Sequence, residues 1–189
     1  LGQQDAFLHP FDDPLLWRGH ASMIDEVANA GIKPQAVVLS VGGGGLFCGV
    51  VEGLRHQGWG DVPVFAVETV GADSLAQSLA AGGRVELPAI TSIATSLGAR
   101  KISQQAWQWA SLQQTKSVVV SDRAAVDACQ HFLDDHRVLV EPACGASLSL
   151  LYENHAALQE FDTLLVIVCG GVTATLAQLQ MWSRHFANA

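Results

Sequence analysis

Four consecutive glycines, Gly42 to Gly45, join two apolar segments and constrain the fold more than any other feature of this chain. Residues 36–41 before them have the composition of a strand, and residues 46–51 after them suit a helix. Because glycine has no Cβ, such a turn can adopt positive φ and bring its backbone N–H groups close to a ligand. A helix N-terminus also attracts anions. The pattern therefore indicates a phosphate cradle, and the plainer alternative is a turn that only packs tightly.

The glycine spacing differs from that of the common nucleotide-binding loops. A P-loop ends in Lys-Ser or Lys-Thr, and neither dipeptide follows here. The dinucleotide fingerprint needs a further glycine where Cys48 stands. We therefore expect that the bound phosphate belongs to neither ATP nor NAD.

The composition predicts one domain over residues 1–189. Apolar residues make up 49% of the chain, which is too many for a disordered protein and enough for a sizeable core. The formal net charge of −8 argues against nucleic acid as a partner. No apolar run reaches the roughly 18 residues that a membrane-spanning helix needs. We therefore expect neither a nucleic acid nor a membrane as a partner.

The N-terminal residues and the cysteines predict a cytoplasmic protein. Residues 1–5 contain no initiator Met and no basic stretch before an apolar one, so they are interpreted as the start of a fragment. The four cysteines form no Cys-x-x-Cys pair and lie among apolar or small residues. We expect buried free thiols rather than disulfides. The seven histidines show no zinc-ligand spacing.

Segments typical of strands and of helices alternate along the chain. Strands are predicted near Ala36–Val41, Val64–Glu68, Ser117–Val120 and Thr163–Val168. Helices are predicted near Arg18–Ala30, Leu46–Gln57, Ser74–Ala81, Ser103–Gln114, Asp122–Asp134, Ala143–Asn154 and Thr175–Phe186. Ser121 is a predicted N-cap, with the acid of Asp122 in the first turn of its helix.

This alternation predicts an α/β fold, in which a parallel twisted sheet has helices on both faces. The predicted strands are continuous apolar runs, as expected when both faces of a sheet are covered. The glycine loop, Glu68 and Cys169 all lie at carboxyl ends of strands. Ligands of such sheets bind at these ends, so we expect the three to share one cleft.

Six motifs give the chain a resemblance to a known enzyme family. They are Pro10-Phe11-Asp12-Asp13-Pro14, Ser40-Val41-Gly42-Gly43-Gly44-Gly45-Leu46, Gly58-Trp59-Gly60-Asp61-Val62-Pro63, Glu68-Thr69-Val70-Gly71-Ala72, Val140-Glu141-Pro142-Ala143-Cys144-Gly145-Ala146 and Val168-Cys169-Gly170-Gly171. In this order they resemble the fold-type II pyridoxal-phosphate enzymes, and within these the L-serine and threonine dehydratase group. The resemblance implies the large cofactor-binding domain of the tryptophan synthase β-like fold, and a homodimer that acts on a small amino acid.

The resemblance also implies roles for residues around pyridoxal 5'-phosphate. The phosphate would be bound by the backbone N–H groups of five consecutive residues, Gly42, Gly43, Gly44, Gly45 and Leu46. Phe11 would stack on one face of the pyridine ring, and Ser96 would lie against the other, where serine dehydratases usually have Ala. Cys169 would lie beside the pyridine nitrogen. From the residues alone, two alternatives remain. Phe11 can be an ordinary core residue, and Cys169 can be a small buried apolar residue.

Within the resemblance, Cys169 bears on the type of reaction. A thiol is only a weak donor, so it would leave the pyridine nitrogen largely unprotonated. Such a ring is a poorer electron sink, which suits β-elimination of water from serine. Threonine dehydratases and serine racemase usually have Ser at this position. Cys169 therefore favours the serine dehydratase group without deciding the substrate.

Glu68 is a charged residue that is also a candidate for the functional site. An acid at a strand end can be a solvated loop residue or can cap the following helix. The resemblance instead implies a K⁺ site made by the Glu68 carboxylate and the carbonyl groups of Ala72, Leu97 and Ala99. One carboxylate with several carbonyl groups suits a monovalent hard cation. Glu141 is expected to face the cofactor cleft.

The Schiff-base lysine of the family has no counterpart in this sequence. The family places it in a Ser-x-Lys or Phe-Lys motif and binds the substrate carboxylate with a Ser/Thr-Gly-Asn loop, and neither motif occurs here. The only lysines, Lys33, Lys101 and Lys116, have other settings. The chain is therefore interpreted as a fragment, inactive alone, that lacks the small N-terminal domain and the lysine.

The function that the resemblance implies for the parent enzyme is that of an L-serine ammonia-lyase. Its reaction is β-elimination of water, which gives pyruvate and ammonia, with some activity on L-threonine that gives 2-oxobutanoate. Serine racemase, another fold-type II enzyme and a non-catalytic module that binds a phosphate ligand are the alternatives.

Overall fold

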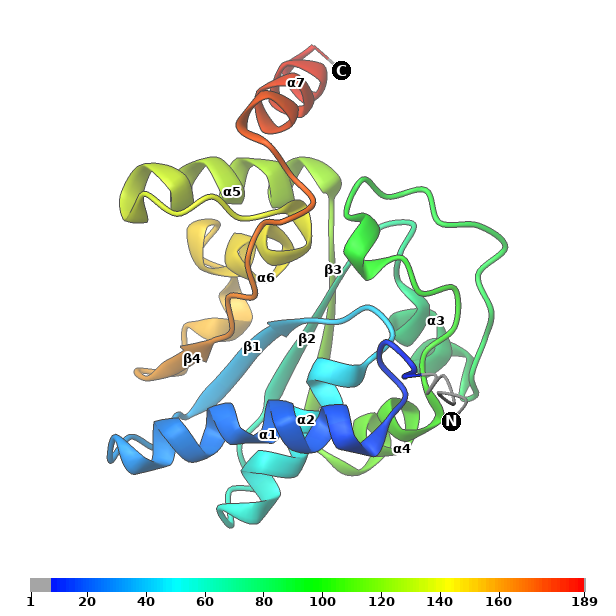
Figure 1. The fold of residues 1–189 in the computed structure, drawn as a ribbon, viewed down its shortest axis with the longest axis vertical. Helices are drawn as coiled ribbons and strands as arrows, with labels where there is room; N and C mark the ends of the chain where they lie inside the picture. The colour runs from blue at the N-terminus through cyan, green and yellow to red at the C-terminus, as the bar shows by residue number, and fades with distance from the viewer. Residues whose placement is uncertain (1–7, 189) are drawn as a thin grey trace, which may run out of the picture.

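A computed structural model describes residues 8–188, in which a four-stranded parallel sheet lies between helices (Figure 1). The strands are β1 (Ala36–Ser40), β2 (Val64–Thr69), β3 (Thr115–Val120) and β4 (Leu164–Val166). Their order is β3-β2-β1-β4, and every neighbouring pair is parallel. The prediction of a parallel α/β sheet is confirmed.

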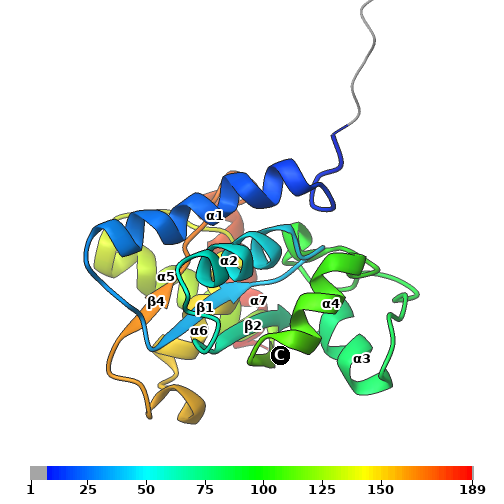
Figure 2. The same ribbon diagram turned by 90° about the horizontal axis from the view of Figure 1, so that it is seen from below.

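Helices cover both faces of the sheet. Those within the described residues are α1 (Pro14–Asn29), α2 (Gly45–His56), α3 (Ser74–Ala81), α4 (Gln104–Leu112), α5 (Asp122–His136), α6 (Pro142–Tyr152) and α7 (Leu176–Ala187), with 3₁₀ turns at Thr95–Leu97 and Ala156–Leu158. In β1, Val37 and Leu39 pack with Ile24 of α1 and Phe47 of α2, which lie together on one side of the strand (Figure 2). Val38 points the other way, into a cluster with residues of α5 and α6. None of the helices within residues 8–188 is both long and apolar enough to cross a bilayer.

The first helix begins earlier than predicted. The prediction started at Arg18, whereas α1 starts at Pro14. Asp13 is its N-cap, and the Asp13 carboxylate accepts a hydrogen bond from the N–H group of Leu15 at 2.8 Å. An acid followed by proline at the first helical position is a known start signal, which the prediction overlooked.

The sheet reverses its strand order at β1. From β1 the chain adds β2 and β3 on one side, and it later returns to place β4 on the other side. Strand β4 ends at Val166, before the predicted Val168, although the N–H group of Ile167 still donates to the carbonyl of Val38 in β1 at 2.9 Å. At such a reversal the carboxyl ends of neighbouring strands leave a crevice, and α/β sheets bind their ligands there.

Candidate functional site

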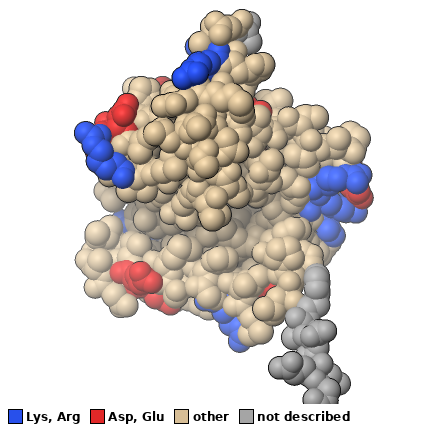
Figure 3. Space-filling model, turned by 45° about the horizontal axis from the view of Figure 1, so that its top comes forward, with Lys and Arg blue, Asp and Glu red and all other residues tan. Residues whose placement is uncertain are grey.

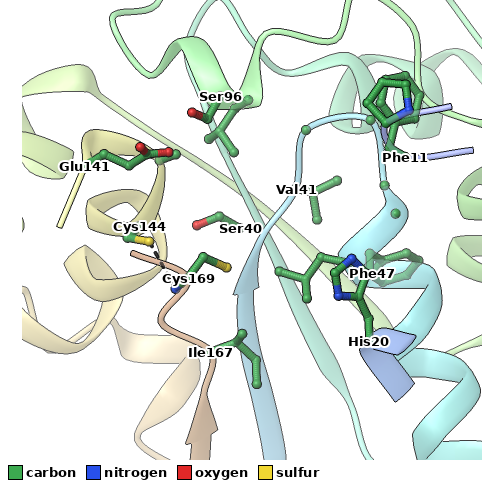
Figure 4. A pocket seen from close by; sticks show the side chains of 18 residues that line it. Phe11, His20, Ser40, Val41, Phe47, Ser96, Glu141, Cys144, Ile167 and Cys169 are labelled. Carbon is green, nitrogen blue, oxygen red and sulfur yellow. Dashed lines mark hydrogen bonds between the residues drawn. The ribbon is translucent and has the colours of Figure 1, made fainter. Parts of the chain in front are cut away.

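A cavity of about 330 Å³ lies where β1 and β4 end (Figure 4). Its walls come from the glycine loop, α1, the 3₁₀ turn at 95–97, the start of α6 and the segment after β4. The lining residues are Pro10, Phe11, His20, Ser40, Val41, Gly42, Gly43, Gly44, Gly45, Leu46, Phe47, Ser96, Leu97, Glu141, Ala143, Cys144, Ile167 and Cys169. All eight residues predicted to bind the cofactor are among them, although they come from four separate parts of the chain.

The glycine loop packs tightly between two distant segments. Gly44 has a φ of 96°, in the left-handed region, and is the N-cap of α2. A Cβ on Gly44 would stand 2.3 Å from the Cβ of Ala106 in α4, and one on Gly43 would stand 2.2 Å from the ring of Phe11. The N–H group of Ser103 donates to the carbonyl of Gly43 at 3.0 Å. The plainer interpretation of the glycines, tight packing, therefore holds for these positions.

The same loop also presents unused hydrogen-bond donors to the cavity. Among residues 8–188, no atom accepts a hydrogen bond from the N–H groups of Gly42–Leu46. Three of these five residues are buried. Because a buried N–H group without an acceptor is costly, the loop calls for water or a ligand with several acceptor atoms. Tight packing of the glycine loop is thus compatible with a role of the loop in binding phosphate.

The charge around the loop also suits an anion. Gly45 and Leu46 begin α2, where the helix dipole is positive and the first turn contains no acidic residue. The described residues of the cavity wall include no Lys or Arg. On the face seen in Figure 3, the blue Lys and Arg side chains lie toward the margin and not around its hollowed centre. An anion in the cavity would therefore be bound by backbone donors and the helix, as a phosphate cradle requires.

Phe11 packs against the glycine loop and lines the cavity. The indole N–H of Trp17 donates to the Phe11 carbonyl at 2.8 Å, which ties this segment to α1. The Phe11 ring meets the ring of His9 edge-on, with centroids 4.5 Å apart, and covers Gly43. Phe11 therefore both packs and lines the cavity, and its stacking on a cofactor ring stays a prediction.

A hydrogen-bond network holds the segment that carries Ser96. The Asp122 carboxylate, at the first residue of α5, accepts the Ser92 hydroxyl at 2.6 Å and the N–H group of Ile93 at 3.1 Å. Ser92 also hydrogen-bonds the hydroxyl of Thr69 at 2.8 Å. The prediction treated Asp122 only as a favourable acid in a helix. No local pattern indicates that it reaches a segment 29 residues earlier.

Cys144 and Cys169 lie together on the cavity wall (Figure 4). The Sγ atom of Cys144 accepts hydrogen bonds from the N–H groups of Cys169 and Gly170, each at 3.2 Å. The interaction between the two cysteine side chains is the main reason why the pKa of Cys144 falls to about 7 and the pKa of Cys169 rises. Cys144 belongs to one of the six motifs, but the sequence alone indicates no role for it.

Cys169 corrects one expectation. Cys48, Cys129 and Cys144 are buried, as expected, but Cys169 is exposed. It follows the end of β4, on the open side of the cavity, so neighbouring elements do not cover it. The alternative interpretation of Cys169 as a small buried apolar residue is therefore wrong.

Glu141 lines the cavity and is buried, as expected for an acid that faces the cleft. Its carboxylate accepts hydrogen bonds from the N–H group of Thr173, at 3.2 Å, and from the Thr173 hydroxyl. These bonds tie the segment that follows Cys169 to the start of α6. Glu141 thereby helps to fix this wall of the cavity.

Glu68 lies outside the cavity and caps a helix. Its side chain is fully buried, and its two carboxylate oxygens accept the N–H groups of Leu75 and Ala76 of α3, at 2.8 and 2.7 Å. Burial raises the pKa of Glu68 to about 8, although the two N–H donors oppose the shift. Glu68 therefore caps α3, as one of the two plainer interpretations of this acid predicted.

Of the four residues predicted to bind the cation, one lines the cavity. Leu97 lines it, whereas Glu68, Ala72 and Ala99 do not. Within residues 8–188, no cluster of three or more His, Cys, Asp or Glu side chains is arranged to hold a metal ion. A site made mainly of carbonyl groups is a different kind of site, and the K⁺ site stays a prediction.

A family comparison matches this architecture. The model of the family described as "Pyridoxal-phosphate dependent enzyme" matches residues 2–170. The chain is 47% identical over 184 residues to the L-serine dehydratase/L-threonine deaminase of Homo sapiens, covering 93% of this chain and 56% of that protein. It is 42% identical over 188 residues to the L-serine dehydratase of Dictyostelium discoideum, covering 94% and 54%. The chain thus spans little more than half the length of these curated relatives.

Solved structures give the same picture. The L-serine ammonia-lyase of the fungus Rhizomucor miehei superimposes with a TM-score of 0.92 at 33% identity, covering 97% of this chain and 61% of that structure. Maize serine racemase superimposes with a TM-score of 0.79 at 26% identity, covering 96% and 57%.

Proposed function

The chain belongs to the pyridoxal-phosphate dependent enzyme family, and from this premise we propose that it supplies the cofactor-binding domain of an L-serine ammonia-lyase. The proposed reaction eliminates the β-hydroxyl of L-serine as water, and a water molecule then releases ammonia by hydrolysis to leave pyruvate, with some activity on L-threonine. The observation that carries the proposal is the set of unused N–H donors of Gly42–Leu46, which share one cavity with Cys169. The identity to serine dehydratases over nearly all of this chain supports the choice of substrate.

The residues of the cavity fit pyridoxal phosphate. The N–H groups of Gly42–Leu46 would hold the phosphate, since the described residues that line the cavity include no Lys or Arg. Phe11 and Ser96 would face the two sides of the ring, and Cys169 would lie at its nitrogen. When bound, the cofactor withdraws electrons from the amino acid and so makes the bonds at its α-carbon easier to break.

Cys169 favours elimination over racemisation because it is a poor acid. The hydrogen bond to Cys144 raises the pKa of Cys169, so Cys169 keeps its proton. A neutral thiol donates a hydrogen bond only weakly and does not protonate a neighbouring ring nitrogen. A reaction in which the β-hydroxyl leaves promptly needs less electron withdrawal than one that must wait for reprotonation. Racemisation is therefore the weaker candidate.

The remaining parts of the proposal concern what lies beyond this cavity. None of Lys33, Lys101 and Lys116 lines it. We infer that the lysine which binds the cofactor covalently, and the loop that binds the substrate carboxylate, come from sequence outside these 189 residues. A K⁺ ion at Glu68, a homodimer and a cytoplasmic location complete the proposal.

The test uses the full-length protein purified with pyridoxal phosphate. We expect equal amounts of pyruvate and ammonia from L-serine, slower formation of 2-oxobutanoate from L-threonine, and little D-serine. D-serine as the main product would support a racemase instead. Tight binding of the cofactor without any product would support a non-catalytic module, and either result would overturn the proposed reaction.

A further inference from the structure

The two cysteines on the cavity wall are in direct contact through the sulfur of Cys144 and the backbone of Cys169. Cys144 lies in the first turn of the buried helix α6, and Cys169 follows β4 in an exposed segment. The N–H groups of Cys169 and Gly170 both donate hydrogen bonds to the sulfur of Cys144, each at 3.2 Å. Figure 4 shows the two side chains next to each other at the cavity. Because the sulfur of Cys144 lies 3.2 Å from the backbone nitrogen of Cys169, rotation of the Cys169 side chain can bring the two sulfur atoms together to form a disulfide.

The electrostatics of this pair differ from those of the other cysteines. The hydrogen bonds to Cys144 lower its pKa to about 7, against the effect of burial and of Glu141, which both raise it. Burial raises the pKa of Cys48 and of Cys129 to about 12. Only a thiolate reacts readily with peroxides, so Cys144 is the reactive sulfur and Cys169 is the thiol placed to resolve it.

We propose that Cys144 and Cys169 form a redox modification site, at which hydrogen peroxide converts the two neighbouring thiols into a disulfide in the cavity wall. The Cys144 thiolate attacks the peroxide, the O–O bond breaks, and the products are a sulfenic acid on Cys144 and hydroxide. The Cys169 sulfur then attacks the sulfenic sulfur, and its proton leaves with the hydroxyl group as water. The two thiols together lose two electrons, which reduce the peroxide, and a dithiol reverses the reaction.

The local backbone allows this change. Helix α6 is buried along most of its length, so Cys144 stays in place and Cys169 moves toward it. Gly170 has a φ of 135°, and a Cβ on it would meet nothing within 4 Å, so open space lies beside the backbone next to Cys169. Cys129 also packs near Cys144, but Cys129 is fully buried in a cluster with Val140 and Leu148 and has no path to the cavity.

One consequence rests on the proposed function. A disulfide removes the Cys169 proton and draws this residue away from the position proposed for the ring nitrogen. The oxidised protein would then bind pyridoxal phosphate less tightly, and bound cofactor would slow the oxidation because it covers Cys169.

The test maps disulfides in the full-length protein, with and without added pyridoxal phosphate. The protein is treated with hydrogen peroxide, its remaining thiols are blocked with N-ethylmaleimide under denaturing conditions, and it is digested without reduction for mass spectrometry. We expect one linked peptide pair, Cys144 to Cys169, that disappears with dithiothreitol. Cys144→Ser and Cys169→Ser should each abolish it, and the control Cys129→Ser should leave it unchanged.

Other outcomes separate the two proposals. A link from Cys144 to Cys129, or peroxide treatment that leaves Cys144 and Cys169 both free, would overturn the modification site. The wild-type map alone decides this if a variant does not fold. If the Cys144–Cys169 link forms but neither the reduced nor the oxidised protein binds pyridoxal phosphate, the modification site stands and the proposed function fails.

Discussion

Gly44 and Ala106 approach so closely that a Cβ on Gly44 would lie 2.3 Å from the methyl carbon of Ala106. This contact locks the start of α2 against α4 and fixes the loop whose N–H groups face the cavity. Gly44 also has positive φ, so two separate costs oppose any side chain at this position. The geometry of the phosphate cradle therefore depends on a helix about 60 residues further along the chain.

Gly44→Ala should destabilise the protein by about 2–4 kcal/mol, because left-handed strain adds to overpacking against Ala106. Gly58→Ala is the matched control, since Gly58 has a φ of 71° but no atom within 4 Å of its Cβ position. It should cost only about 1–2 kcal/mol. Urea unfolding of the full-length variants measures both values. Equal costs would mean that the contact with α4 relaxes freely.

Asp122→Asn should lower both stability and cofactor affinity. The change weakens the bonds to Ser92 and Ile93 and so loosens the segment that carries Ser96, at a cost of about 1–3 kcal/mol. Asp127→Asn, in the same helix, removes only an exposed ion pair with Arg123 and should cost less than about 1 kcal/mol. Urea unfolding and absorbance titration with pyridoxal phosphate test the pair. Cofactor affinity that falls equally in both variants would contradict a positioning role for Asp122.

The stability of the protein should depend on the ionisation of Glu68. Burial raises the pKa of Glu68 from 4.5 to about 8, so the folded protein holds this proton more tightly than the unfolded chain does. Its stabilising contribution is therefore complete below about pH 4.5 and is lost as the pH rises to about 8. Across this window the unfolding free energy of the wild type should fall more than that of Glu68→Gln. Parallel pH profiles would contradict the buried, protonated carboxyl group.

The same residue tests the proposed cation. A bound K⁺ ion favours the charged carboxylate, so KCl should stabilise the wild type near pH 8 more than tetramethylammonium chloride does at equal ionic strength. Glu68→Gln should not distinguish the two salts. If the wild type does not distinguish them either, Glu68 is a helix cap alone.

Cys169→Asp should shift the products from L-serine. A carboxylate beside the ring nitrogen would hold a proton there, which a thiol does not, and would favour reprotonation of the amino acid over loss of its hydroxyl group. The ratio of D-serine to pyruvate should therefore rise in the full-length variant. Cys169→Ser, which keeps a neutral donor, is the control and should leave elimination dominant. An unchanged ratio in the Asp variant would mean that this position does not set the course of the reaction.

Structural features could be predicted from the sequence where they depend on residues that are close together along the chain. The bounds of α3, Ser74–Ala81, agree with the prediction, and Ser121 caps α5 as expected by accepting the N–H group of Ala124. The glycine loop between a strand and a helix likewise has a local signature. Such features depend on neighbouring residues, which a pattern along the chain can detect.

Features that join distant segments could not be predicted in this way. Cys144 meets the N–H groups of residues 25 and 26 positions later, and the Ser40 hydroxyl meets an N–H group 107 positions later. No periodicity specifies such a pair. The resemblance assigned Cys169 to the site, but only the structure showed that the backbone N–H group of this exposed residue contacts the buried sulfur of Cys144.

A crystal structure of the full-length protein with pyridoxal phosphate tests the central claim most directly. The account predicts the phosphate within hydrogen-bond distance of the N–H groups of Gly42–Leu46, and the pyridine nitrogen beside the sulfur of Cys169. A cofactor phosphate bound elsewhere, with the glycine-loop N–H groups paired only to water, would contradict it.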